Sequence, residues 1–110
     1  MSKTMNTSRI LELVEEKKEQ FITLSDAIWA VPELGLAEHR SAGLLIQALE
    51  REGFQVERGI DGIETAFVGT YGSGRPVIGL LAEYDALPGL SQEAACTSHK
   101  PLAEGEPGHG

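Results

Sequence analysis

The segment VIGLLAEYDALPGL, residues 77–90, decides how the chain is interpreted. An apolar run from Val77 to Ala82 leads into a short charged stretch and closes on a proline and a glycine. Apolar residues fall on both sides of the pleat, which is typical of a strand covered on both faces. We therefore predict a buried strand that ends either at the protein surface or at the edge of a site.

Two helices are predicted before this strand. From about residue 8 to residue 31, apolar side chains recur at helical spacing, and Pro32 ends the pattern because proline has no N–H to donate. A second apolar helical face runs from about residue 37 to residue 52. Gly53 can then adopt the left-handed conformation that closes a helix, with Phe54 packing back onto its last turn.

After Gly53 the period of the sequence changes from helix to strand. Three strand candidates follow, FQVER (54–58), ETAFVGTY (64–71) and PVIGLLAEY (76–84), and GSGRP (72–76) reads as the tight turn between the last two. The fold class predicted is therefore α/β, with two N-terminal helices followed by about three strands. Residues 91–110 are small, polar and rich in Gly and Pro, and they predict a loop without regular structure.

Composition excludes several classes of partner. The chain has 110 residues and a net charge of −8, without a basic patch, so neither nucleic acid nor an anionic membrane surface is an expected partner. Cys96 is the only cysteine and cannot form an internal disulfide, which fits a reducing compartment. With no apolar run that suits a signal peptide or a membrane span, we expect a cytoplasmic protein.

Two short motifs carry little chemistry. Gly72-Ser73-Gly74 begins like a dinucleotide fingerprint, but Val77 stands where the third glycine belongs and no helix follows. Cys96 and His99 have zinc-ligand spacing, and His109 lies ten residues further on. A structural zinc site needs about four ligands on a scaffold, so an ordinary loop is favoured and the roles of these three residues stay open.

Glu83 and Asp85 are the strongest candidate site residues. Because strand residues two apart point to the same side, both carboxylates are expected to face one space at the carboxyl end of the strand. Ligands of open α/β sheets bind at such strand ends, and a cation there would relieve the repulsion between two carboxylates. A solvated strand end explains the same residues equally well, so local sequence leaves both interpretations open.

Three stretches together resemble a known family. PELG (32–35), EYDALPG (83–89) and GEPGHG (105–110) are similar to the N-terminal part of the zinc-dependent amidohydrolases, the family of aminoacylases and carboxypeptidase-like metallopeptidases. The likeness is closest to the p-aminobenzoyl-glutamate hydrolase branch. It implies that residues 1–90 are the N-terminal part of an incomplete α/β catalytic domain. Residues 91–110 would then be a loop leading to a metal-binding motif beyond the chain end.

The resemblance also implies roles for site residues. Many family members carry His-x-Asp at the end of this strand; Asp85 matches the aspartate, which orients a metal ligand from behind, whereas Glu83 occupies the histidine position. Glu83 is therefore placed in the pocket with an open role, and no metal ligand is assigned within the chain. His109 matches the lead-in to a Cys-Gly-His motif, and Cys96 does not match the cysteine of that motif.

The function implied is metal-dependent hydrolysis of the amide bond of N-acyl or aroyl amino acids, such as p-aminobenzoyl-glutamate. The complete protein is expected to use zinc or another divalent metal, to act on a small-molecule substrate and to form a homodimer only through a lid domain absent from this chain. The chain alone is expected to bind no metal and to be inactive. The alternative is a non-catalytic truncated chain that acts at most as an interaction segment.

Overall fold

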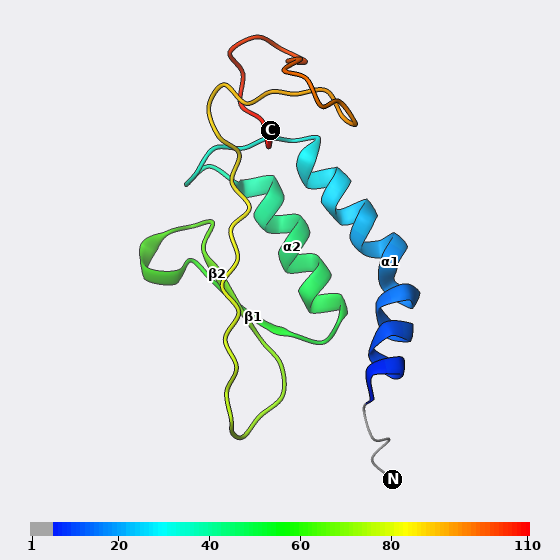
Figure 1. Cartoon of the computed structure of the whole chain (residues 1–110). Coiled ribbons are helices and arrows are strands. Elements are labelled where there is room, and N and C mark those ends of the chain that lie inside the picture. The colour runs from blue at the N-terminus through cyan, green and yellow to red at the C-terminus, as the bar shows by residue number, and fades with distance from the viewer. Residues whose placement is uncertain (1–5) are drawn as a thin grey trace.

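A computed structural model describes residues 6–110 of the chain (Figure 1), so residues 1–5 of the predicted first domain lie outside the described residues. The elements, in chain order, are α1 (Thr7–Trp29), α2 (His39–Arg51), β1 (Gln55–Arg58), the short 3-10 helix η1 (Ile60–Gly62) and β2 (Phe67–Thr70). This order confirms the predicted α/β class with two helices ahead of the strands. Both helices begin and end within about two residues of the predicted limits.

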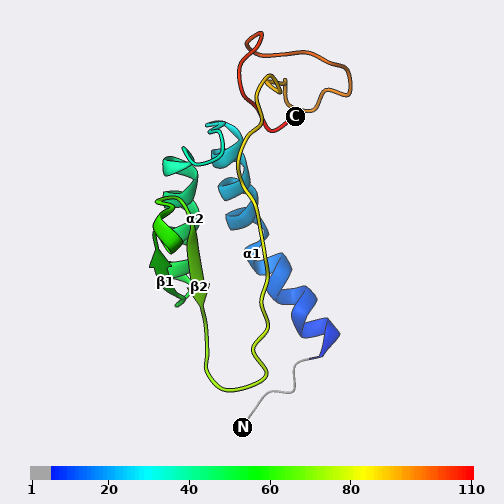
Figure 2. The same ribbon diagram turned by 90° about the vertical axis from the view of Figure 1, so that its left-hand side faces the viewer.

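The helices and strands form three layers. Figures 1 and 2 show α1 and α2 lying side by side in opposite directions, with the two-stranded sheet against the other side of α2. The strands are antiparallel, with Gln55 opposite Thr70. A methyl group added to Gly69 would lie 3.0 Å from Leu49 Cδ1 and 3.5 Å from Phe54 Cδ1, so the last turn of α2 sits directly on β2.

The cap predicted at the end of α2 is confirmed. Gly53 has a φ of 87°, in the left-handed region that glycine adopts without steric cost. The Phe54 N–H donates to the Leu49 carbonyl at 3.0 Å, and the Gly53 N–H donates to the Glu50 carbonyl at 3.1 Å. These two bonds satisfy carbonyls that the helix end would otherwise leave free, and they turn the chain into β1.

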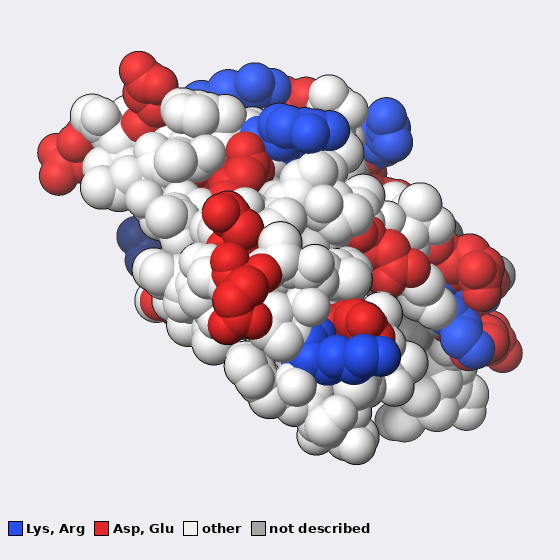
Figure 3. All heavy atoms as spheres, turned by 90° about the horizontal axis from the view of Figure 1, so that it is seen from above, with Lys and Arg blue, Asp and Glu red and all other residues white. Residues whose placement is uncertain are grey.

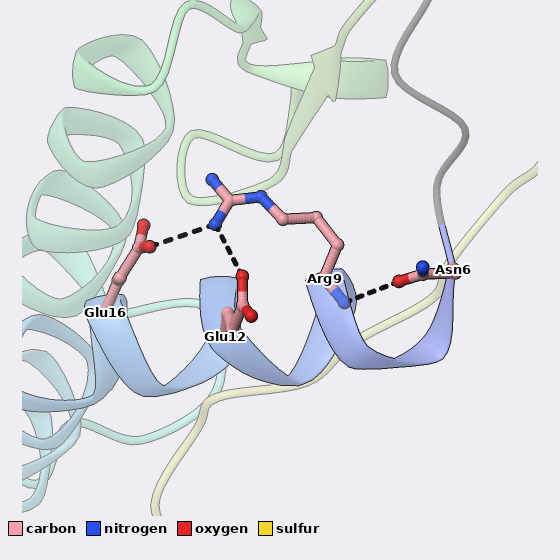
Figure 4. A network of polar contacts seen from close by, with 4 residues as sticks. All are labelled: Asn6, Arg9, Glu12 and Glu16. Atoms are coloured by element: carbon pink, nitrogen blue, oxygen red, sulfur yellow. Dashed lines mark hydrogen bonds and ion pairs between the residues drawn. The ribbon is translucent and has the colours of Figure 1, made fainter.

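Local polar contacts fix the start of α1 (Figure 4). The Asn6 side chain accepts a hydrogen bond from the Arg9 N–H at 2.9 Å and so caps the helix. The Arg9 guanidinium contacts Glu12 at 3.0 Å and Glu16 at 3.2 Å, one and two turns further along. Because these contacts are exposed, they support the helix locally but do not hold it against the rest of the chain.

The described residues bury little apolar surface. The buried apolar residues among them are Ala42, Ile46 and Ala86, and α1 contains no buried residue at all. The radius of gyration is 17.0 Å, whereas a compact domain of this length has a value of about 13 Å. The chain therefore presents apolar faces, including most of α1, that it does not itself cover.

The third predicted strand does not form, and the prediction of about three strands is corrected to two. Residues 77–82 are extended, but no backbone hydrogen bond within residues 6–110 involves them. Leu80 is 96% exposed and Leu81 is 98% exposed. A strand needs a hydrogen-bonded neighbour, and β1 and β2 pair only with each other, so the segment that the sequence marks for burial is left uncovered.

Residues 91–110 contain no helix or strand and form a loop above α2 in Figure 1. Hydrogen bonds across the loop hold its two arms together: Ser91 N–H donates to the Glu106 carbonyl at 3.1 Å, and Glu93 N–H donates to the Lys100 carbonyl at 2.9 Å. Figure 3 shows acidic and basic side chains interspersed on one face of the molecule, with no continuous basic patch there. Of the described helices, none is long and apolar enough to cross a membrane.

Candidate functional site

The end of the 77–90 segment is the one part of it that the chain holds firmly. The Ala86 N–H donates to the Glu33 carbonyl at 2.8 Å, which forms a parallel bridge between Leu34 and Ala86. On the other side, Leu87 and Gly108 exchange two backbone hydrogen bonds of 3.0 and 3.1 Å. Ala86 is only 1% exposed as a result. Three stretches far apart in sequence therefore meet at this point.

Glu33 joins this junction to the start of α2. Its carboxylate accepts hydrogen bonds from the Arg40 N–H at 3.0 Å, from the Ser41 N–H at 2.7 Å and from the Ser41 hydroxyl at 2.7 Å. Partial burial, the largest single influence, acts to raise the pKa of Glu33, but these hydrogen bonds and the charge of Arg40 together outweigh it and lower the pKa. Glu33 thus supplies the cap that Glu38, at the N-cap position, does not provide.

A second polar group anchors the residue before Asp85. The Tyr84 hydroxyl donates to the Thr65 carbonyl, and the Tyr84 ring packs against Phe67 of β2 with ring centroids 5.9 Å apart. The Thr65 hydroxyl donates to the buried Glu38 carboxylate at 2.8 Å. Burial and then the nearby charge of Glu38 raise the pKa of Tyr84, so its hydroxyl stays a donor at neutral pH.

Asp85 lies beside Gly35, and Glu83 lies further out. A methyl group added to Gly35 would sit 3.6 Å from Asp85 Oδ2 and 3.9 Å from Glu38 Oε1, so two carboxylates converge on this glycine. Asp85 is half-buried, whereas Glu83 is exposed. The structure therefore brings Asp85, but not Glu83, into contact with the PELG stretch.

The described residues show no ready-made set of metal ligands. Within residues 6–110, no group of three or more His, Cys, Asp or Glu side chains is placed to hold a metal ion. His109 follows the bridged Gly108, and its Nε2 atom is buried without a hydrogen-bond partner among the described residues. No catalytic step can therefore be derived through a metal held by these residues.

Cys96 and His99 lie away from the strand end. Both line an open depression of the surface together with Asp26 and Trp29 of α1. Hydrogen bonding with the Ser98 side chain, and then with the Ser98 backbone, lowers the pKa of Cys96. His109 does not line this depression, so the three residues with zinc-ligand potential do not share one surface hollow.

Comparisons with known proteins give this geometry a context. No family model matches the chain. The chain is 43% identical over 99 residues to a subunit of the p-aminobenzoyl-glutamate hydrolase of Escherichia coli (strain K12), a match that covers 90% of this chain and 21% of that protein. It is also 35% identical over 106 residues to the Xaa-Arg dipeptidase of Mus musculus and 34% identical over 109 residues to the Xaa-Arg dipeptidase of Homo sapiens.

The chain is homologous to part of these hydrolases. Each dipeptidase match covers 87% of this chain and 24% of the relative. The chain thus spans between a fifth and a quarter of the length of the curated relatives it matches. This agrees with the resemblance to amidohydrolases and peptidases drawn from the sequence, and with an α/β unit that leaves its apolar faces uncovered.

Sequence reasoning missed four residues that hold the junction. Glu33 lies in the PELG stretch that carried the resemblance, yet no local rule reveals its role, because it caps a helix that begins six residues later. Glu38 and Thr65 are 27 residues apart, and only the folded chain brings them together. Tyr84 could have been singled out from the sequence, because it is a polar aromatic residue inside the charged stretch and next to Asp85.

The Glu33 cap yields a prediction about pH. Glu33→Gln is expected to cost about 1 kcal/mol and Glu33→Ala about 2 kcal/mol of stability, because charge-assisted hydrogen bonds are lost. Since folding lowers the pKa of Glu33, its contribution is present above the ordinary value of 4.5 and disappears as the pH falls through the lower folded value. Exchange rates of the Arg40 and Ser41 amides at pH 6 and pH 3 measure this directly.

The wild-type chain should lose protection of these two amides on acidification, and Glu33→Gln should show little pH dependence. Glu15→Gln, on an exposed part of α1, is the matched control and should behave as wild type. Equal protection in all three proteins would remove Glu33 from the cap.

Proposed function

We propose that this chain is the part of a metal-dependent amidohydrolase that contains one edge of its catalytic domain. The reaction proposed for the complete enzyme is hydrolysis of the amide bond between an acyl or aroyl group and an amino acid, with p-aminobenzoyl-glutamate as the first substrate to test. The observation that carries the proposal is the 43% identity to a p-aminobenzoyl-glutamate hydrolase over nearly the whole chain.

In this proposal Asp85 is a positioning residue. The junction of residues 33–35, 84–87 and 108 fixes its backbone, and its half-buried carboxylate lies beside a second carboxylate at Gly35. Zinc or another divalent metal would supply the activated water, and residues outside 6–110 would have to complete its set of ligands. The pocket role of Glu83 belongs to the proposal as well, and its exposure leaves it free to face residues outside this chain.

The division of the chain and its compartment are also proposed here. Residues 1–90 would belong to the catalytic domain, and residues 91–110 would lead toward the metal ligands. A cytoplasmic location is supported by the single cysteine, Cys96, which suits a reducing compartment. The partner proposed is a small-molecule N-acyl amino acid, and any homodimer of the complete enzyme would form through a lid domain.

The gene provides the first test. The reading frame is expected to continue past Gly110 with Cys-Gly-His and to encode further His and Glu residues. The complete protein, loaded with zinc, should then release p-aminobenzoate from p-aminobenzoyl-glutamate or free amino acid from an N-acyl amino acid. A stop codon directly after Gly110 would instead favour the non-catalytic alternative, and a complete but inactive protein would reject the proposed substrate class.

A separate prediction concerns the isolated chain of 110 residues. We expect no amidase activity and no zinc affinity tighter than micromolar, because the described residues offer no preformed set of ligands. We also expect the purified chain to associate, and the amides of the exposed apolar segment 77–82 to exchange quickly. Calorimetric titration with zinc and hydrogen exchange test these points. A well-protected monomer that holds one zinc ion would contradict them.

A further inference from the structure

Glu38 is a buried carboxylate that the start of α2 does not use. It stands at the N-cap position and is 8% exposed, yet its side chain makes no capping hydrogen bond, and Glu33 supplies the cap instead. The Glu38 Oε2 atom accepts a hydrogen bond from the hydroxyl of Thr65, which is 5% exposed. Burying a charge costs desolvation, and one hydrogen bond from a neutral hydroxyl offsets that cost only in part. Stability alone therefore does not explain why a carboxylate occupies this position.

Thr65 links Glu38 to the residue before Asp85. The Thr65 side chain donates to Glu38, and the Thr65 backbone carbonyl accepts from the Tyr84 hydroxyl. The Tyr84 ring is held in turn by its contact with Phe67 of β2. A continuous series of contacts thus runs from the first residue of α2, through the connection before β2, to the segment that carries Asp85.

Asp85 is held from both sides. The residue before it, Tyr84, is anchored through its side chain, and the residue after it, Ala86, is anchored through its backbone N–H to the Glu33 carbonyl at 2.8 Å. With both neighbours fixed, the backbone at Asp85 has little freedom to turn. The direction in which the Asp85 carboxylate points therefore depends on both anchors.

We propose that Glu38 is a positioning residue that fixes the Asp85 carboxylate through Thr65 and Tyr84. The other Glu38 carboxylate oxygen, Oε1, approaches Asp85 at Gly35, where an added methyl group would lie 3.9 Å from this oxygen and 3.6 Å from Asp85 Oδ2. The inference rests on the proposed function only for the chemical task of Asp85. The contacts that hold Asp85 can be tested without any activity.

Removal of the Thr65 hydroxyl tests the linkage in the 110-residue chain. Thr65→Val keeps the shape of the side chain and the carbonyl that binds Tyr84, but it leaves the Glu38 carboxylate buried without its donor. We expect the Ala86 amide to exchange about tenfold faster than in wild type. Thr65→Ser retains the hydroxyl and should protect this amide, as should the control Thr70→Val on the exposed end of β2.

Two results of this exchange experiment would overturn the proposal. One is equal protection of the Ala86 amide in Thr65→Val and wild type, which would show that the hydroxyl does not hold the segment. The other is an equal loss of protection in Thr65→Ser, which would assign the effect to the buried methyl group and not to the hydrogen bond with Glu38.

The Tyr84 phenol gives a second readout, which is specific to the charge of Glu38. Burial, and then this charge, raise the pKa of Tyr84, and Glu33 adds a smaller effect in the same direction. Glu38→Gln keeps an acceptor oxygen but removes the charge, so Tyr84 should titrate at lower pH. Absorbance measures this in a Tyr71→Phe background, where Tyr84 is the only tyrosine. Glu15→Gln on α1 should leave the titration in place, and an unmoved titration in Glu38→Gln would overturn the proposal.

A double-mutant cycle in the complete enzyme tests whether the linkage acts through Asp85. Thr65→Val should lower kcat about tenfold with little change in KM, because a displaced positioning group costs turnover. Added to Asp85→Asn, it should cost no more than about twofold further, whereas independent effects would multiply. Losses that multiply would overturn the proposal. If the complete protein is inactive, the proposed function fails, and the exchange and titration results still decide whether Glu38 holds residues 84–86.

Discussion

Asp85→Asn is expected to lower the turnover or the metal affinity of the proposed amidohydrolase by about 10- to 100-fold, the usual cost of losing a group that orients a metal ligand. Asparagine keeps the size and shape of the side chain, and the Ala86 to Glu33 hydrogen bond uses only the backbone. The junction should therefore stay intact. What is lost is the negative charge that would raise the basicity of a neighbouring ligand.

Metal content, turnover and melting temperature of Asp85→Asn and wild type separate two interpretations. If Asp85 is merely a solvated carboxylate, the substitution should shift stability by no more than about 0.5 kcal/mol and leave activity unchanged. Asp26→Asn, an identical change on the exposed surface of α1, is the control for the loss of one charge. Unchanged turnover with full metal occupancy in Asp85→Asn would remove Asp85 from the chemistry.

The elements that the sequence predicted well are those set by neighbours in the chain. Helix α2 ends where Gly53 supplies a left-handed residue and the Phe54 N–H donates to the Leu49 carbonyl, so the whole cap lies within six consecutive residues. The hairpin of β1 and β2 is likewise local, with its strands joined by a short connection. Such features depend on spacing and turn chemistry, which a sequence displays directly.

The segment 77–82 was harder to predict because a strand depends on a partner. Its composition marks it for burial, and that property is real, since no other described stretch is so apolar and so exposed at once. Composition does not indicate which segment supplies the neighbouring strand. Pairing is a long-range property, and the described residues contain only two strands, which are satisfied by each other.

The candidate site was predicted only in part for the same reason. Asp85 could be singled out because a carboxylate at the end of an apolar strand is unusual. The contacts of Glu33 with Arg40 and Ser41 depend on how the turn after α1 folds back, and the pair Glu38 and Thr65 depends on α2 meeting the sheet connection. Alternation of apolar and polar residues carries no information about either contact.

Gly108→Ala is expected to detach residues 101–110 from the junction and to cost about 3 kcal/mol or more locally, at or beyond the upper range of ordinary overpacking. An added methyl group would overlap the Leu90 carbonyl oxygen and lie 2.6 Å from the Ser91 Cα atom. These are backbone atoms, which cannot rotate away as a side chain would. The hydrogen bonds between Leu87 and Gly108 should therefore break.

Exchange of the Leu87 and Ser91 amides reports this detachment, since both donate across the loop to residues 106–108. Gly43→Ala is the matched control with the opposite sign. Gly43 lies in α2 with nothing within 4 Å of an added methyl group, and replacing a helical glycine by alanine gains up to about 1 kcal/mol. If the Leu87 amide stays protected in Gly108→Ala, the close approach at this glycine does not hold the loop in solution.

The same substitution connects the fold to the proposed chemistry. Gly108 holds the backbone next to His109 against the end of the segment 77–90, and Asp85 lies two residues before Leu87 on that segment. Detaching Gly108 would therefore change the distance between Asp85 and the residues that follow His109. The side chains of Asp85 and His109 would themselves be unaltered. In the complete enzyme, Gly108→Ala should thus lower activity at least as much as Asp85→Asn. Full activity in Gly108→Ala would show that the junction does not position the catalytic site.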